Sequence, residues 1–419
     1  MQNSSVLSVS RARASYAALF SVSAAAALGK TLVYARVLQP AEFGAVGLTV
    51  LVATFAAYLG SVGITDGLGS AVPLARGRGE DSTALRSAGL SGVIQLSLIA
   101  GLLTTVVCSL VMPVRAEYMV LLLAGPLLSL TAILNALFVD LQARELNVPY
   151  AFLLLLKSAL PLLLAVPMGR TSGALGVVGA ELIGAALCIA LFGWRWRGGL
   201  IWSRDRAAAV GLARLGAPYV TGNVLQNVSM NADRWAVQSA HGVQGLGTYG
   251  FAMHLSSIGM VLLNMVQLYA SPRLLRRFGT DGDKVALRRH SIRIALILAG
   301  AYAAAAVPLV LAFPWLLERF FPAYIGAAPL ALWVALGTGA IALGYFDVLF
   351  RAAGNGRPVA AIQAVAVIVG VVVAGLAAAL DAPLWVFALG FCLARVTTTC
   401  LGWTAGLWIL RRAGTALGR

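Results

Sequence analysis

A few charged side chains lie inside stretches of this sequence that are otherwise apolar: Lys30, Lys157 and Glu181. Placing a lysine in hydrocarbon costs roughly 2.5 kcal/mol or more, so such groups are expected to pair with each other or to line a polar cavity. At a rise of about 1.5 Å per residue, and counted from opposite sides of the membrane, Lys157 and Glu181 both lie ~10–14 Å deep, near the middle of the ~30 Å core. Their depth predicts either a structural ion pair or a site for a coupling ion.

A stripe of amides follows in the stretch 208–232, where Asn223, Asn227 and Asn231 are spaced at i, i+4 and i+8. Gln226 and Asp233 lie close to the same helical face. Amides inside a membrane bundle hydrogen-bond to neighbouring helices, which is one interpretation of the stripe. The other is that the stripe lines a hydrated central cavity, and the sequence leaves both open.

Further cations lie near the outer ends of these stretches. Lys30 is ~22 Å from the inner end of its stretch, which places it in the outer half of the membrane. Arg36 and Arg234 lie near the exits, where long side chains also reach the headgroups by snorkelling. Arg395, in the last apolar stretch, has no evident partner in the sequence.

The composition is that of a membrane protein. The chain has 419 residues, of which 60% are hydrophobic and only 11% are charged, whereas soluble domains are about 25% charged. About twelve apolar stretches are long enough to span a bilayer, and in lipid each must be a helix. The expected spans are 15–35, 44–64, 85–111, 118–140, 148–168, 174–194, 208–232, 245–270, 290–313, 324–346, 358–380 and 384–410. The first resembles a signal peptide, but its apolar run continues to Val33, which favours an uncleaved span.

The net charge of +16 comes from Lys and Arg in the short connections, mostly those that fall on the amino-terminal side of the membrane. This bias predicts that both termini are cytoplasmic. Because the charges flank membrane helices and no RNA- or DNA-binding motif accompanies them, we expect no nucleic-acid partner.

The two halves of the chain repeat one another. "DSTALR" (81–86) and "VDLQAR" (139–144) recur as "DKVALR" (283–288) and "FDVLFR" (346–351), about 200 residues later. This offset covers six spans, so both halves enter the membrane in the same direction and form a parallel repeat. The expected organisation is a six-helix lobe at 1–194, a basic cytoplasmic linker at 195–207 and a second six-helix lobe at 208–419.

Motifs for enzymatic chemistry are missing from the sequence. It has no phosphate-binding Gly-rich loop that ends in Lys-Ser/Thr, no G-x-S-x-G and no H-E-x-x-H. Its four cysteines and three histidines lack metal-ligand spacing. We therefore expect no catalytic residues, no metal and no cofactor, and a protein that is not an enzyme.

Three segments carry a resemblance to a known family: "RVLQPAEFGAVGL" (36–48), "NADRWAVQSAHGVQGLGTYGFA" (231–252) and "FRAAGNGRP" (350–358). They resemble the polysaccharide biosynthesis, or Wzx-type, flippases of the multidrug/oligosaccharidyl-lipid/polysaccharide (MOP) exporter superfamily. The resemblance implies a V-shaped, MATE-like fold of two six-helix bundles around a central, often cationic cavity. It also implies a bacterial inner-membrane protein that flips undecaprenyl-diphosphate-linked oligosaccharides (O-antigen, exopolysaccharide or capsule units) by alternating access.

On this resemblance, Lys30, Arg36 and Arg234 bind the diphosphate, and Asn223, Gln226, Asn227 and Asn231 line the cavity. Asp233, Lys157 and Glu181 are candidates for coupling to H⁺ or Na⁺. Expected partners are the lipid-linked oligosaccharide, membrane lipids, and glycan polymerase or export proteins. A MATE-like drug/ion antiporter stays open as an alternative, and so does a membrane glycan polymerase or ligase, although the chain lacks the large outer loop such an enzyme would need.

Overall fold

The computed structural model describes the backbone of residues 2–111, 116–281, 283–352 and 357–412. Within these ranges it describes all side chains except those of residues 2–14, 17, 74, 77, 116–118, 218–219, 221–223, 255–273, 275–277, 279–281, 347, 351, 357 and 412. The chain divides into two compact units, Met1–Val224 and Leu225–Arg419. Each unit is described by itself.

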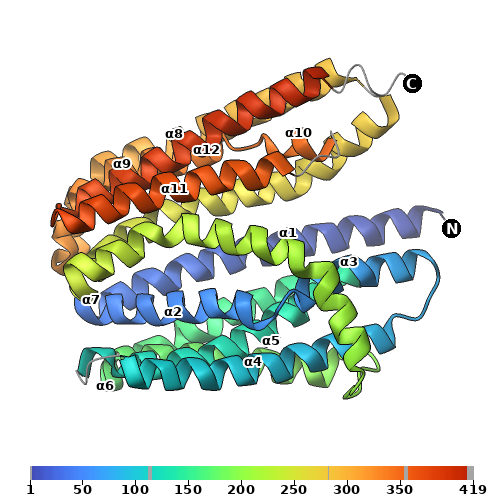
Figure 1. Cartoon of the computed structure of the whole chain (residues 1–419), viewed down its shortest axis with the longest axis horizontal. Helices are drawn as coiled ribbons and strands as arrows, with labels where there is room; N and C mark the ends of the chain where they lie inside the picture. Colours follow the sequence, from blue (N-terminus) through green and yellow to red (C-terminus); the bar gives the residue numbers. More distant parts are fainter. Residues whose placement is uncertain (1, 112–115, 282, 353–356, 413–419) are drawn as a thin grey trace. The chain divides into compact units, whose positions relative to one another are not determined.

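The first unit is helical throughout its described part (Figure 1). Its elements are α1 (Gln2–Val37), α2 (Pro40–Gly60), α3 (Ile64–Gly77), α4 (Thr83–Val111), the 3₁₀ helix η1 (Ala116–Leu123), α5 (Ala124–Ala143), α6 (Asn147–Arg195) and the beginning of α7 (Arg206–Asp281). Helix α1 packs along α6, and α5 packs against α2, α3, α4 and α6. The core of this unit therefore lies around α5.

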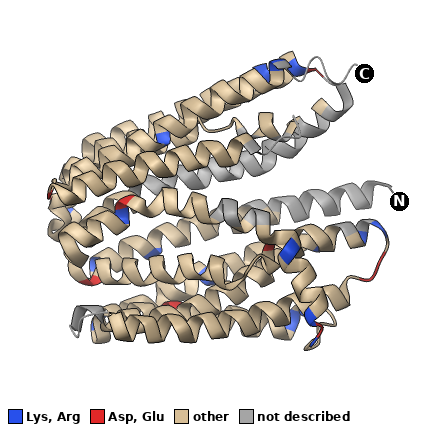
Figure 2. Cartoon of the chain, in the orientation of Figure 1, with Lys and Arg blue, Asp and Glu red and all other residues tan. Residues whose placement is uncertain are grey.

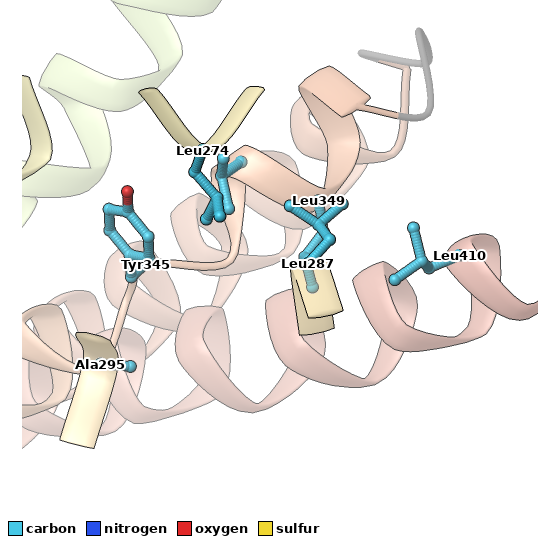
Figure 3. Close-up of a cluster of buried hydrophobic side chains, with 7 residues drawn as sticks. Leu274, Leu287, Ala295, Tyr345, Leu349 and Leu410 are labelled. Atoms are coloured by element: carbon cyan, nitrogen blue, oxygen red, sulfur yellow. The ribbon is translucent and has the colours of Figure 1, made fainter. Parts of the chain in front are cut away.

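The second unit contains the rest of α7, followed by α8 (Lys284–Phe320), the 3₁₀ helix η2 (Pro322–Leu330), α9 (Ala331–Ala342), α10 (Asp347–Ala352), α11 (Arg357–Ala379) and α12 (Leu384–Arg412). Helix α12 packs against α9, α10 and α11. A cluster of buried apolar side chains joins α7, α8, α10 and α12 (Figure 3), including Leu274, Leu287, Leu349 and Leu410.

Nine helices of the described residues are long and apolar enough to cross a membrane. Two long helices are each interrupted by a glycine: α6 at Gly173 (φ 54°, ψ −134°) and α7 at Gly242 (φ 64°, ψ −166°). Such backbone angles are readily available only to glycine. Helix α6 thus covers two predicted spans, as does α7. The predicted class, an all-α polytopic membrane protein, is confirmed, and Figure 2 shows most charged residues near helix ends and connections.

The repeat predicted from the sequence is visible in the order of elements. The series α4, η1, α5 of the first unit recurs as α8, η2, α9 in the second. The copies differ at one place, because α5 continues without interruption whereas α9 ends at Ala342 and the chain resumes as α10 at Asp347. Helix α12 compensates for the break, since Trp403 Nε1 donates to the Leu343 carbonyl (2.7 Å) and Thr399 Oγ1 donates to the Ala340 carbonyl (2.7 Å).

The compact units divide inside α7 because the first turns of that helix pack closely against α3. A Cβ atom at Gly216 would lie 1.9 Å from the Gly63 carbonyl oxygen, and one at Gly67 would lie 2.2 Å from the Leu212 carbonyl oxygen. Only glycine permits this approach of two backbones. The division after Val224 follows from contacts within each unit, whereas the lobe boundary expected at 195–207 follows from the sequence repeat. The lobe boundary therefore stays a prediction.

Candidate functional site

Lys30 pairs with Glu181 in the first unit. Its Nζ lies 2.6 Å from Glu181 Oε1, and the hydroxyl of Tyr34, one turn further along α1, donates to the same oxygen at 2.8 Å. The pair keeps some access, because the side chains of Lys30 and Glu181 are 20% and 13% exposed. Lys30 is thus tolerated inside an apolar helix because α6 supplies a counter-charge.

Lys157 lies beside this pair without joining it. Its Nζ is 5.6 Å from the centre of the Phe138 ring, a cation–π geometry, and it lies within electrostatic range of both Lys30 and Glu181. The predicted ion pair of Lys157 with Glu181 is therefore wrong in its partner. Depth along the helix was similar, but Glu181 faces α1, and sequence depth alone does not determine the direction in which a side chain points.

Most lysines of this chain lie close to Glu181. The sequence contains three lysines, Lys30, Lys157 and Lys284, and two of them lie here with a single carboxylate. We call Lys30, Tyr34, Lys157 and Glu181 the unit 1 cluster. Its formal charge is positive, which makes it a candidate site for an anion at membrane depth.

The amide stripe on α7 satisfies part of its own hydrogen bonding. Asn231 Nδ2 donates to the backbone carbonyl of Asn227 at 2.9 Å and to its side-chain oxygen at 3.1 Å. Gln226 is exposed, Asn227 and Asn231 are half-buried, and the side chain of Asn223 lies outside the described residues. The predicted i, i+4 relation is therefore observed for Asn227 and Asn231, whose amides bond along their own helix.

A second polar cluster lies inside the second unit. Tyr249 donates its hydroxyl to Asp233 Oδ2, and Arg395 of α12 donates Nη2 to the Ser229 carbonyl and, at 2.9 Å, to the Ser229 hydroxyl. Asp233 and Arg395 interact electrostatically and are each 5% exposed. We call Ser229, Asp233, Tyr249 and Arg395 the unit 2 cluster.

Three buried polar atoms around this cluster, Asp233 Oδ1, Arg234 Nε and Arg395 Nε, have no hydrogen-bond partner among the described residues. Of the predicted diphosphate ligands, Arg234 is half-buried beside Asp233 on α7, and Arg36 is exposed in the last turn of α1. Lys30 and Arg36 thus belong to the first unit and Arg234 to the second.

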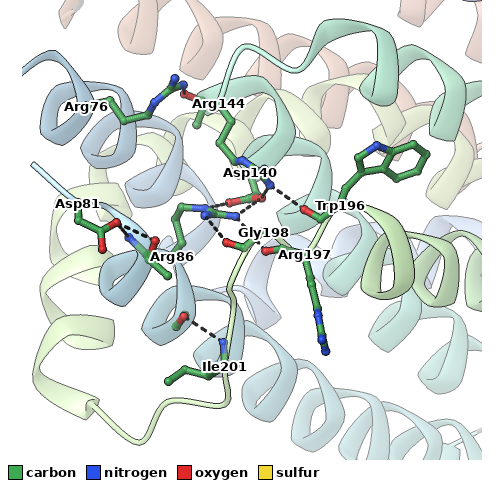
Figure 4. A network of polar contacts seen from close by, with 12 residues as sticks. Arg76, Asp81, Arg86, Asp140, Arg144, Trp196, Arg197, Gly198 and Ile201 are labelled. Carbon is green, nitrogen blue, oxygen red and sulfur yellow. Dashed lines mark hydrogen bonds and ion pairs between the residues drawn. The ribbon is translucent and has the colours of Figure 1, made fainter. Parts of the chain in front are cut away.

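Sequence reasoning missed a buried ionic network that holds the segment after α6. Arg86 of α4 pairs with Asp140 of α5 through two contacts of 2.5 Å and 3.0 Å, with side chains 5% and 0% exposed (Figure 4). Arg144 donates to Asp140 at 3.4 Å and to the Trp196 carbonyl at 2.8 Å. The signal was present, because Arg86 ends "DSTALR" and both Asp140 and Arg144 lie in "VDLQAR", two motifs noted only as repeats.

The network continues into the connection between α6 and α7. Arg86 reaches the carbonyls of Arg197 (3.4 Å) and Gly198 (3.5 Å), and the hydroxyl of Ser91 accepts the Ser203 N–H at 3.0 Å. In the connection before α4, the hydroxyl and N–H of Thr83 both donate to Asp81, and these bonds hold the pKa of the Asp81 carboxyl below its ordinary value.

In the described part of the chain, no group of three or more His, Cys, Asp or Glu residues could hold a metal ion. The polar chemistry of the described helices comes from the unit 1 cluster, the unit 2 cluster, the amides of α7 and the Arg86–Asp140–Arg144 network. Together with the fold, these features define a multi-pass membrane protein whose helices carry ionisable groups at membrane depth, a pattern typical of transporters.

Solved structures with a similar fold include transporters of the MOP superfamily. An inward-facing multidrug resistance MATE family transporter is 16% identical over 95% of both chains, with a TM-score of 0.70. An outward-facing one is 18% identical over 95% of this chain and 94% of that one (TM-score 0.63). A MOP superfamily transporter from Pyrococcus furiosus Vc1, whose binding pocket is described as having reverse polarity, is 18% identical over 96% and 97% (TM-score 0.61).

A profile described as "Polysaccharide biosynthesis protein" matches residues 33–274. The chain belongs to this family, as the resemblance predicted, and it has the MOP fold. No curated protein sequence matches it.

Proposed function

We propose that this protein is a flippase that moves an oligosaccharide linked to undecaprenyl diphosphate from the inner to the outer leaflet of the bacterial cytoplasmic membrane. Its membership of the polysaccharide biosynthesis family and its MOP fold support a role in exporting a glycan precursor. In this proposal both termini are cytoplasmic, and a glycan polymerase or export proteins receive the flipped product.

The unit 1 cluster is the observation that carries the proposal. A diphosphate brings about two negative charges, and ionised donors bind phosphate oxygens through strong, short hydrogen bonds. Two lysine side chains, Lys30 and Lys157, lie with the one carboxylate of Glu181, and the Lys30–Glu181 pair is partly accessible. An incoming diphosphate can therefore replace Glu181 as the partner of Lys30.

This exchange of partners suggests how transport is coupled to an ion. When the diphosphate binds Lys30, Glu181 loses its counter-charge and becomes a site for H⁺ or Na⁺. Rocking of the two lobes then exposes the site to the other side. Asp233, whose buried Oδ1 makes no hydrogen bond to a described residue, is the second candidate for the coupling ion. Arg36 and Arg234, with the amides Asn223, Gln226, Asn227 and Asn231, are proposed to contact the diphosphate and the sugar hydroxyls.

The test is a deletion in the host, complemented with wild type, Lys30→Gln or Lys284→Gln. Lys284 begins α8 and is the matched control, because it is the one lysine outside the unit 1 cluster. Lipid-linked precursor is measured on each side of the inner membrane, together with surface glycan and the level of each protein. We expect precursor to accumulate on the cytoplasmic side in the deletion and in Lys30→Gln, while Lys284→Gln restores export. Unchanged surface glycan in the deletion strain would overturn the flippase proposal.

A drug/ion antiporter is the second candidate. It is favoured by the partly accessible Glu181 carboxylate, which could bind a cationic compound, and by the fold shared with MATE transporters. In that case the deletion would raise susceptibility to cationic drugs without accumulation of lipid-linked precursor, and Glu181→Gln would have the same effect.

A further inference from the structure

The first unit contains a cavity of about 300 Å³ to which no role has been assigned. It lies where four helices begin or end: α2 near Tyr58, α3 near Thr65, α5 near Gln142 and α6 near Tyr150. In the proposed orientation, this end of the unit faces the cytoplasm. The cavity is at the lower end of the ~300–1,000 Å³ range of small-molecule sites, so it can hold one small ring but not a whole oligosaccharide.

The lining of the cavity combines flat apolar faces with hydrogen-bonding groups, and it includes one carboxylate, Asp66. Tyr58, Phe138 and Tyr150 provide aromatic rings, while Asn135 and Gln142 provide amides. A primary amide both donates and accepts hydrogen bonds, and so does a tyrosine hydroxyl. A sugar ring has a complementary surface, because its C–H face is apolar and its hydroxyls donate and accept.

One buried polar atom of the lining lacks a partner. The hydroxyl oxygen of Thr65 is inaccessible to solvent and makes no hydrogen bond to any described residue. An unsatisfied buried hydroxyl costs free energy, and an occupant with hydroxyl groups would satisfy it.

The cavity adjoins the unit 1 cluster. Phe138 is one of the residues that line the cavity, and the centre of its ring lies 5.6 Å from Lys157 Nζ. Lys157 in turn lies within electrostatic range of Lys30 and Glu181. An anionic group at the lysines and a sugar ring in the cavity would therefore be neighbours, as they are in a glycosyl diphosphate, where the first sugar is bonded directly to the phosphate.

We propose that this cavity is a subsite for the first sugar of the lipid-diphosphate-linked glycan. Thr65, Asn135 and Gln142 hydrogen-bond to the sugar hydroxyls, and the aromatic rings cover its apolar face. The inference rests on the proposed function and adds to it a site that recognises the first sugar before transport. The subsite selects a glycosylated carrier over the bare lipid diphosphate, which would otherwise compete for the same lysines.

The test compares the binding of two lipids to the purified full-length protein in nanodiscs. One is undecaprenyl diphosphate, and the other is the lipid-linked oligosaccharide extracted from the deletion strain. The variants are Asn135→Leu, which removes the amide at similar volume, and Thr65→Val, which removes the unpartnered hydroxyl. Thr398→Val is the matched control, because Thr398 is a buried threonine of α12 that bonds only to its own helix.

We expect wild type and Thr398→Val to bind the glycosylated lipid about tenfold more tightly than the bare lipid, as one or two additional hydrogen bonds provide. Asn135→Leu and Thr65→Val should bind the bare lipid as wild type does while losing most of this preference. Lys157→Gln should weaken the binding of both lipids. Thermal unfolding of Thr65→Val should occur at or above the wild-type temperature, since the lost hydroxyl is buried and makes no hydrogen bond to any described residue.

Two results would overturn the subsite and are distinguishable from each other. If wild type binds both lipids equally, or if the variants keep the wild-type preference, the cavity takes no part in recognition and the flippase proposal stands. If wild type binds neither lipid, the proposed function fails together with the subsite.

Discussion

The two units each place a carboxylate and a cation inside their helices but treat them differently. In the unit 1 cluster, the Lys30 and Glu181 side chains are 20% and 13% exposed and bond directly to each other. In the unit 2 cluster, Asp233 and Arg395 are each 5% exposed, and each has a different hydrogen-bond partner, Tyr249 for Asp233 and Ser229 for Arg395. An accessible ion pair can exchange partners with a ligand, whereas the buried Arg395 of α12, which bonds to Ser229 of α7, mainly holds two helices together.

The comparison also indicates that the positive charge of Lys30 is more important for transport than for stability. Replacing both partners of a largely buried ion pair leaves no uncompensated charge and is often close to neutral for stability, so removing the whole Lys30–Glu181 pair should leave the fold intact. A buried ionic group whose partner is removed costs about 3–5 kcal/mol. Function and stability should therefore separate between the unit 1 cluster and the unit 2 cluster.

The largest expected effect is on transport by the exchange variant Lys30→Glu with Glu181→Lys. It preserves an ion pair between α1 and α6 but moves the cation to the other helix. We expect transport to fall roughly 10- to 100-fold, as for the loss of one or two hydrogen bonds to a charged group, with thermal unfolding close to wild type. Flipping of lipid-linked precursor in proteoliposomes measures the effect. Full activity of the exchange variant would mean that the pair is only structural.

A large stability effect is expected for Arg86→Met. This change leaves Asp140 buried and paired only with Arg144, which lies farther away at 3.4 Å. We expect a loss of about 3–5 kcal/mol in the free energy of unfolding, read from chemical denaturation in detergent. Arg86→Met combined with Asp140→Leu should recover part of it, and a double variant no more stable than the single one would contradict the paired role.

A moderate stability effect is expected for Arg395→Met in the unit 2 cluster. It removes the hydrogen bonds to Ser229 and the cation that faces Asp233. We expect about 2–3 kcal/mol of destabilisation, with Asp233→Asn in the same chain restoring part of it. If instead transport is lost at wild-type stability, the unit 2 cluster takes part in the cycle and the contrast between the units fails.

The smallest effect is expected for Tyr34→Phe, which deletes one hydrogen bond to Glu181 and keeps the Lys30 pair. A hydrogen bond to a charged group contributes about 1.5–3 kcal/mol to stability, but the Lys30 cation stays in place, so a change of only a few-fold in transport is expected. The same assay with Tyr302→Phe, which loses one hydrogen bond to the Ala335 carbonyl in the second unit, is the matched control. Equal effects of the two changes would show that Tyr34 has no special role in the exchange.

The sequence by itself determined the class of fold and the inventory of unusual residues. Long apolar stretches in lipid must be helices, because unpaired backbone groups find no water there. The repeated motifs correctly anticipated that α4, η1 and α5 have counterparts in α8, η2 and α9. Lys30, Lys157, Glu181 and Asp233 could be identified because charge inside such a stretch is costly wherever its partner lies.

Only the tertiary structure decided which of these residues meet. Rise per residue gives the depth of a side chain but not its direction around the helix, so Glu181 was assigned to Lys157 when its partner is Lys30 of α1. Arg86 and Asp140, 54 residues apart, meet because α4 and α5 pack together, and Arg395 reaches Ser229 across 166 residues. The cavity among α2, α3, α5 and α6 was also invisible in the sequence, because its lining comes from four helices whose packing no local pattern encodes.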